Sequence, residues 1–129
     1  MPRPAPRPQP DPATDGRIVT QALFRAADLM GLTQAEVAEI IGVSTSTASR
    51  LRNGQARLEA GSKPFQLAAL LLRAWRSLDT IVSSSDAVAR EWLRSPNEGL
   101  AEARPVDLLA RPEGLARVCD YLDSRRGRL

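Results

Sequence analysis

The chain has 129 residues, enough for one domain or for two small ones joined by a helix. It contains no histidine and a single cysteine, Cys119, which excludes imidazole-based catalysis, histidine metal ligands and an intramolecular disulfide. The formal net charge is +3, with seventeen arginines and one lysine against fifteen acidic residues. This balance favours an acidic partner, but no segment is polycationic, so any nucleic-acid contact must come from a localised patch.

The N-terminal segment 1–16 is predicted to be a disordered, proline-rich tail. Prolines at positions 2, 4, 6, 8, 10 and 12 remove backbone donors and favour extended polyproline II. A flexible arm and a proline-recognition segment both remain open, and Arg3 and Arg7 could contact a phosphate backbone. The segment lacks the apolar stretch of an export signal, and the longest apolar run, 67–72, is too short to span a membrane. We therefore expect a cytoplasmic protein without membrane contact.

From Ile18 onward the apolar residues follow a helical period, and no stretch alternates as a β-strand does, which predicts an all-α fold. An N-terminal helix-turn-helix bundle over 17–83 should be followed by a small C-terminal helical bundle over 84–129. The predicted helical segments are, in chain order, 18–30, 33–41, 44–53, 64–82, a segment from 86 that ends before Pro96, a single turn over 105–109, and 113–125.

Capping residues predict several of these helix ends. Thr33 and Glu36 have the spacing of a capping box, in which each side chain accepts a hydrogen bond from the backbone amide of the other residue. Gly31 and Gly42 are suited to end the first and second helices, and Ser44 is suited to begin the third. The sequence thus predicts two short helices joined by a tight turn.

This helix pair carries the most informative motif of the chain. A small residue, Ala38, lies where the two helices should cross, and Gly42 occupies a turn that needs a positive φ. The apolar anchors around the turn are Val37, Ile41, Val43, Ala48 and Leu51. Together, residues 34–51 resemble the helix-turn-helix of phage-repressor and Xre-type regulators. A helix pair used only for packing is the alternative.

The residues left facing outward are short hydroxyls and arginines, with no acid among them. Hydroxyls can contact base edges or phosphates, and arginine can bond guanine O6 and N7 together. In the family that the motif resembles, the position of Gln34 contacts phosphate, beside the free amides of a helix N-terminus. Arg52 departs from many relatives, which carry an acid there. The predicted DNA-binding residues are Gln34, Ser44, Thr45, Ser46, Thr47, Ser49, Arg50 and Arg52.

The second half of the chain has a pattern of its own. It comprises Trp92, Leu93, Pro96, Asn97, Leu100, Pro105, Leu108, Leu109, Gly114, Val118, Leu122 and Gly127. This pattern resembles the toxin-binding domain of the MbcA/ParS/Xre antitoxins, and with the motif in front the resemblance covers about 17–129. The chain departs from that family at Ala101 and Glu102, where two glycines are usual, and at Ser124, where isoleucine is common. From the residues alone, Trp92 and the leucines also fit the core of a helical bundle.

The resemblance implies an antitoxin that blocks the active site of a RES-domain, NAD-degrading toxin and represses its own operon. The implied partners are that toxin and operator double-stranded DNA, bound by a homodimer, with no cofactor. The implied toxin-binding residues are Trp92, Leu100, Leu109, Arg125, Arg126, Arg128 and Leu129. The C-terminal arginines could also simply complement a helix dipole.

Two other functions compete with this interpretation. One is a plain transcriptional repressor whose C-terminal half only dimerises. The other is an enzyme, which the sequence disfavours because it has no acid pair, glycine-rich phosphate loop or metal-ligand cluster to replace the missing histidine. A neighbouring gene for a RES-domain protein would separate the antitoxin from the plain repressor.

Overall fold

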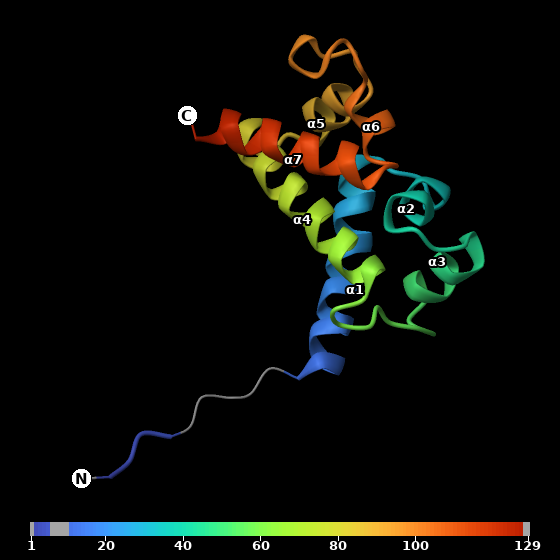
Figure 1. The fold of residues 1–129 in the computed structure, drawn as a ribbon, viewed down its shortest axis with the longest axis vertical. Helices are drawn as coiled ribbons and strands as arrows, with labels where there is room; N and C mark the ends of the chain where they lie inside the picture. Colours follow the sequence, from blue (N-terminus) through green and yellow to red (C-terminus); the bar gives the residue numbers. More distant parts are fainter. Residues whose placement is uncertain (1, 6–10, 128–129) are drawn as a thin grey trace.

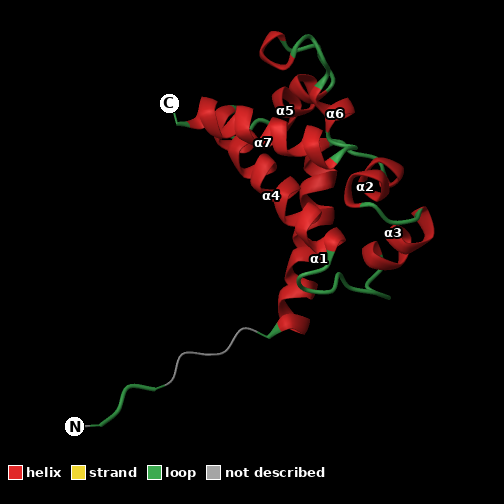
Figure 2. Ribbon diagram, in the orientation of Figure 1, coloured by secondary structure: helices red, strands yellow, loops and turns green. Residues whose placement is uncertain are grey.

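The computed structural model describes residues 2–5 and 11–127, and within these ranges the fold is all-α, without a strand (Figure 2). This confirms the predicted fold class. The helices are α1 (Pro12–Met30), α2 (Gln34–Ile41), α3 (Thr45–Arg52), α4 (Lys63–Ile81), α5 (Asp86–Leu93), the 3₁₀ helix η1 (Glu98–Leu100), α6 (Pro105–Leu108) and α7 (Pro112–Arg126). Arg7, Arg128 and Leu129, to which the sequence assigned contacts, lie outside the described residues.

Helix α1 begins at Pro12, earlier than the predicted start at Ile18, so residues 12–16 form its first turns and are not part of a tail. Asp11 caps the helix, because its side chain accepts a hydrogen bond from the Ala13 amide at 3.1 Å. Proline fits the first turn of a helix, since its fixed φ is helical and its missing N–H is not needed there. The prediction of a tail is therefore wrong for residues 12–16, because the cap at Asp11 allows Pro12 to begin a helix.

The early turns of α1 pack against the segment that precedes α4. Gly16 is buried, and a Cβ at this position would lie 2.1 Å from the carbonyl oxygen of Leu58. The buried Thr20 hydroxyl donates to the Gly16 carbonyl at 2.6 Å and accepts from the Leu58 amide at 2.9 Å. The start of α1 is therefore part of the packed fold.

The ends of α2 and α3 confirm the predicted caps. Thr33 and Glu36 form the reciprocal capping box at the start of α2. Gly31 ends α1 and Gly42 ends α2, both in the left-handed conformation, with φ of 69° and 74°. Ser44 caps α3 by accepting a hydrogen bond from an amide of its first turn. Local signals alone therefore place this helix pair correctly.

Helix α4 lies between the two halves of the chain (Figure 1). It packs on α1 and α2 on one side and most extensively on α7 on the other. Its buried residues Leu71, Ala74 and Leu78 belong to one hydrophobic cluster that runs from Leu23 in α1 to Leu122 in α7. The two halves consequently share a single core.

Polar contacts also join α4 to α7. Arg73 forms an ion pair with Asp123, and the Ser77 hydroxyl donates to the other oxygen of that carboxylate at 2.8 Å. Cys119 is buried, and its thiol donates to the Leu70 carbonyl at 3.2 Å. Burial raises the pKa of Cys119 to about 11, so its thiol is neutral at physiological pH.

The loop between α5 and α6 turns through two consecutive left-handed residues, Ala101 with φ of 56° and Glu102 with φ of 65°. Asn97 closes the loop, because its carbonyl accepts from the Glu102 amide at 2.8 Å and its amide donates to the Ala103 carbonyl at 3.0 Å. The chain thus makes this turn with residues that lack the conformational freedom of glycine.

Candidate DNA-binding and partner-binding surfaces

Helix α3 presents a polar surface to the outside. Ala48 and Leu51 are buried beneath it, where α3 packs on α2. The outward residues form what we call the recognition face, which comprises the exposed Ser44, Thr45, Ser46 and Arg50 and the half-buried Thr47 and Ser49. This arrangement is the one that the helix-turn-helix motif predicts.

Hydrogen bonds within the recognition face order its side chains. The Thr47 hydroxyl oxygen accepts from the Ser44 hydroxyl at 3.0 Å and from Arg50 Nη2 at 3.2 Å. These contacts hold the Arg50 guanidinium along the surface of α3, where it remains exposed. Gln34 is the first residue of the neighbouring helix α2 and is half-buried at its N-terminus.

Arg52 differs from the other predicted DNA-binding residues. Its guanidinium forms two hydrogen bonds to the Asp28 carboxylate, at 2.9 and 3.3 Å, and its central carbon lies 4.8 Å from the centre of the Phe24 ring. Donation by Arg52 lowers the pKa of Asp28. Arg52 therefore stays at the surface, but its charge is compensated and its side chain fastens the end of α3 to α1.

The structure changes the set of residues available to a protein partner. Leu100 and Leu109 were expected to lie on a docking face, but they are 1% and 0% exposed and belong to the core. Leucines at helical spacing pack inward, and spacing alone does not distinguish core from contact. Trp92 is half-buried, whereas Arg125 and Arg126 are exposed at the end of α7.

Trp92 lies in a surface groove between the end of α4, α5, the η1 loop and α7. The groove has a volume of about 940 Å³, and we call it the aromatic groove; its lining includes Ile81, Val88, Trp92, Gly99, Tyr121 and Arg125. The Trp92 and Tyr121 rings stack with their centres 6.2 Å apart, and the Arg125 guanidinium lies 5.6 Å from the centre of the Tyr121 ring. Val88 is 50% exposed on its wall.

Sequence reasoning missed Val88 and Tyr121 in this groove. Val88 lies one helical turn before Trp92 on α5, so the two share a face, which was the available signal. The sequence gives no such signal for Tyr121, because its position beside Trp92 depends on how α7 packs against α5 and the η1 loop. The groove combines aromatic and aliphatic side chains with the charged side chains of Arg125, Glu98 and Glu102. A partly apolar groove bordered by polar groups is typical of a protein-docking surface.

Arg90 in α5 and Arg94, the residue that follows this helix, join the C-terminal half to the end of α1. Arg90 donates to the carbonyls of Asp28 and Leu29, at 2.8 and 3.0 Å, and Arg94 donates to the Gly31 carbonyl at 3.0 Å. Helix C-termini leave carbonyls without partners, and cations stabilise that end of the helix dipole. The recognition face and the aromatic groove are thus held on one rigidly connected frame.

Comparisons with known proteins find matches for both halves of the chain. Residues 9–73 match the family model of the antitoxin Xre-like helix-turn-helix domain, and residues 77–128 match that of the antitoxin Xre/MbcA/ParS C-terminal toxin-binding domain. The fold is similar to a chain in the crystal structure of the M. tuberculosis MbcT–MbcA toxin–antitoxin complex. The TM-score is 0.65 at 25% identity, over 87% of this chain and 96% of that chain. No curated protein matches this chain.

Two further properties concern only the part of the chain that the structure describes. None of its helices combines the length and the apolar character that a transmembrane segment requires. Its acidic and cysteine side chains form no group of three or more that could hold a metal ion.

Proposed function

Since this chain belongs to the Xre-type antitoxins, in which a helix-turn-helix domain is followed by a toxin-binding domain, we propose that it neutralises a RES-domain, NAD-degrading toxin and represses its own operon. The observation that carries the proposal is the presence of two separate surfaces on one core, the recognition face on α3 and the aromatic groove beside α5 and α7. Both matching domains are antitoxin domains, and no enzymatic activity is assigned to the chain.

DNA binding would use the recognition face in a major groove. Its hydroxyls and Arg50 supply donors and acceptors for base edges, and no acidic side chain of α3 repels the phosphates. Gln34, at the N-terminus of α2, would contact a phosphate together with the free amides of that helix end. A homodimer would present two recognition faces to half-sites about one helical turn, or a multiple of it, apart.

Toxin binding would use the aromatic groove, with the C-terminal arginines beside it. Val88, Trp92 and Tyr121 offer the partly exposed apolar area that a protein partner can cover. A site that consumes NAD must attract phosphates, so a guanidinium from Arg126 could occupy the same anion position by bidentate bonding. NAD would then be excluded by competition. Arg128 and Leu129 would extend this contact.

The docking part of the proposal is tested by co-expression with the protein of the adjacent open reading frame, which the proposal expects to be a RES-domain toxin, followed by co-purification. Val88→Asp should prevent recovery of the complex, because docking would have to remove the new carboxylate from water at a position where Val88 offers apolar contact area. Ile18→Asp is the matched control, since Ile18 is 57% exposed on α1, away from the groove. Equal recovery of the complex with both variants would contradict docking at the groove.

The inhibition part is tested separately by measuring NAD consumption by the purified complex. Deletion of 125–129 should restore NAD consumption while the complex still forms through the groove. Full inhibition by the shortened chain would show that the bundle itself blocks the toxin site. If no RES-domain partner is recovered and the chain nevertheless binds its upstream DNA as a dimer, the plain repressor is the correct function.

A further inference from the structure

A second groove lies on the DNA-binding half, between α1 and the segment that follows α3. It has a volume of about 870 Å³, and no acidic side chain is found among its described lining residues. We call it the basic groove; its lining includes Arg17, Gln21, Phe24, Arg52, Asn53 and Arg57. Neither the motif nor the family matches assign a role to these residues as a group.

The basic groove continues the recognition face. On α3, Ser46 and Arg50 are four residues apart, and Asn53 follows three residues later, so the three side chains lie in one row along the helix. Asn53 lines the groove where that row ends. The segment beyond it is held against α3, because the amides of Gln55 and Ala56 donate to the Arg50 carbonyl at 2.9 and 3.1 Å. The two surfaces therefore form one continuous, fixed shape.

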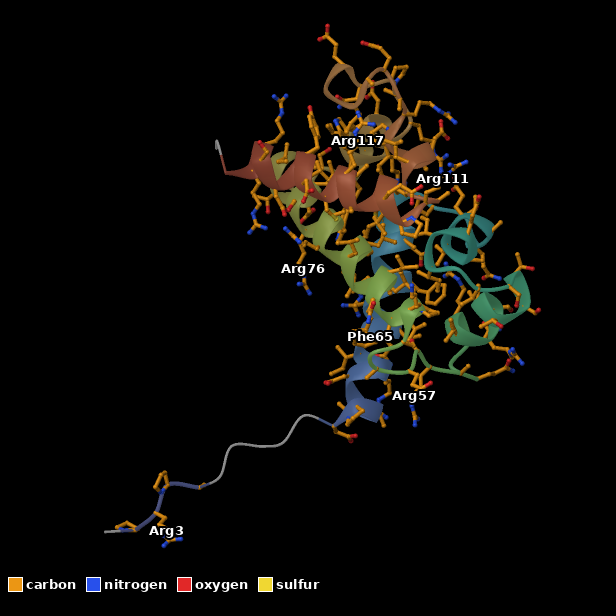
Figure 3. All side chains as sticks on the ribbon, in the orientation of Figure 1. Arg3, Arg57, Phe65, Arg76, Arg111 and Arg117 are labelled. Carbon is orange, nitrogen blue, oxygen red and sulfur yellow. The ribbon has the colours of Figure 1, made fainter. Side chains whose placement is uncertain are left out.

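Two cations of the basic groove are available to a ligand. The charge of Arg52 is compensated by Asp28. Arg17 and Arg57 are exposed, and within the described part of the chain neither forms an ion pair. Figure 3 shows Arg57 on the segment beside the start of α1, whereas Arg117 lies at the opposite end of the molecule. Gln21 adds an amide donor to the lining of the groove.

We propose that the basic groove binds phosphates of the DNA strand that flanks the base pairs read by α3, with Arg17 and Arg57 each neutralising one phosphate. The inference rests on the proposed DNA binding by the recognition face. A DNA strand that follows a recognition helix in the major groove reaches the surface beyond that helix, and cations placed there gain binding energy by releasing counterions. The contact is independent of sequence, because it involves phosphates and no base.

The test compares three single variants, Arg17→Ala, Arg57→Ala and, as matched control, Arg117→Ala. Each substitution lowers the formal net charge of +3 by one. A difference in DNA affinity among the three variants therefore depends on the position of the lost charge and not on the net charge. Binding to a mixed-sequence duplex and to the duplex upstream of this gene is measured by fluorescence anisotropy over a series of salt concentrations. Circular dichroism of each variant checks that the surface substitution leaves the fold intact.

Arg17→Ala and Arg57→Ala should each reduce the slope of log affinity against log salt by about 0.9, and the double variant by about twice that amount. Both duplexes should be weakened by the same factor, and Arg117→Ala should keep the slope of the unmodified chain. If the groove variants match Arg117→Ala while Arg50→Ala has lost base discrimination, the basic groove does not contact DNA and the proposed function stands. If the unmodified chain binds neither duplex, both proposals are overturned.

Discussion

Arg94, at the C-terminal end of α5, and Glu36 in α2 form an ion pair that links the two halves of the chain, with Arg94 Nη2 2.8 Å from Glu36 Oε1. The same oxygen of Glu36 accepts from the Thr33 amide at 2.9 Å, so one carboxylate serves both the cap of α2 and the contact with α5. Donation by Arg94 is the main reason that the pKa of Glu36 lies below its ordinary value.

The Arg94–Glu36 pair should make stability depend on pH. Because the pKa of Glu36 is lower in the folded than in the unfolded chain, the pair stabilises the fold at neutral pH, and this contribution is lost as the pH falls below the ordinary glutamate range. Both side chains are partly exposed, so we expect about 1 kcal/mol or less from the pair. Arg94→Ala should lower the melting temperature near neutral pH.

Thermal unfolding of the original chain and of Arg94→Ala, from about pH 7 to about pH 3, checks this. The gap in melting temperature between the two should narrow in acid. Arg76→Ala, an exposed arginine of α4 in no ion pair within the described residues, should show no such change. A gap that stays constant with pH would assign the effect of Arg94 to its hydrogen bond with Gly31 alone.

Replacing Ala101 by glycine should stabilise the protein. Ala101 is exposed and has a φ of 56°, a conformation that costs an L-residue with a Cβ about 1 kcal/mol relative to glycine. Ala69→Gly, at an exposed position inside α4, should instead destabilise by about 1 kcal/mol. Chemical denaturation of both variants measures whether each substitution raises or lowers the free energy of unfolding. Destabilisation by Ala101→Gly would mean that the loop does not hold the left-handed conformation in solution.

Replacing Gly16 by alanine should destabilise the fold by more than about 1 kcal/mol, although alanine is the better helix former. The added Cβ would lie 2.1 Å from the Leu58 carbonyl oxygen, a backbone atom that cannot simply rotate away. Arg25→Ala, an exposed change on the same helix, should leave the melting temperature nearly unchanged. If Gly16→Ala is as stable as the original chain, the start of α1 does not pack on the Leu58 segment.

Arg50→Ala should reduce discrimination between the upstream DNA of this gene and a scrambled duplex. A bidentate arginine–guanine contact is worth about 1–3 kcal/mol of discrimination, whereas loss of a phosphate contact weakens all sequences alike. Competition binding with the two duplexes measures the ratio directly. Equal weakening on both would show that Arg50 contacts the backbone and reads no base.

Features set by neighbours in sequence could be predicted here, and features set by distant packing could not. The capping box of Thr33 and Glu36 and the turn at Gly42 are confirmed, because each depends on residues within one helical turn. Leu100 and Leu109 were assigned to a docking face and are buried, since their exposure depends on how α7 and α6 pack. A leucine is equally hydrophobic in a core and on a docking face, so its residue type does not distinguish the two.

The arginines illustrate the same limit. Arg90 in α5 and Arg94 just after it have the spacing of an ordinary solvent-facing pair, and nothing near them in the sequence indicates that they reach Asp28 and Gly31. Arg17 and Arg57 are likewise brought to one groove only by the packing of the segment after α3 on α1. Sequence reasoning can find the charged residues of a surface, but their partners come from tertiary structure.

The core that Leu71 and Leu78 of α4 share with both halves has a consequence for turnover of the protein in the cell. A single core favours a single cooperative unfolding transition, so α3 and the aromatic groove should lose their shapes together. A protease that captures the unfolded chain would then remove both surfaces in one event, and it would do so faster when neither ligand is bound. Under the proposed function, release of the DNA and release of the toxin would be synchronous, without any signal passing between the two sites.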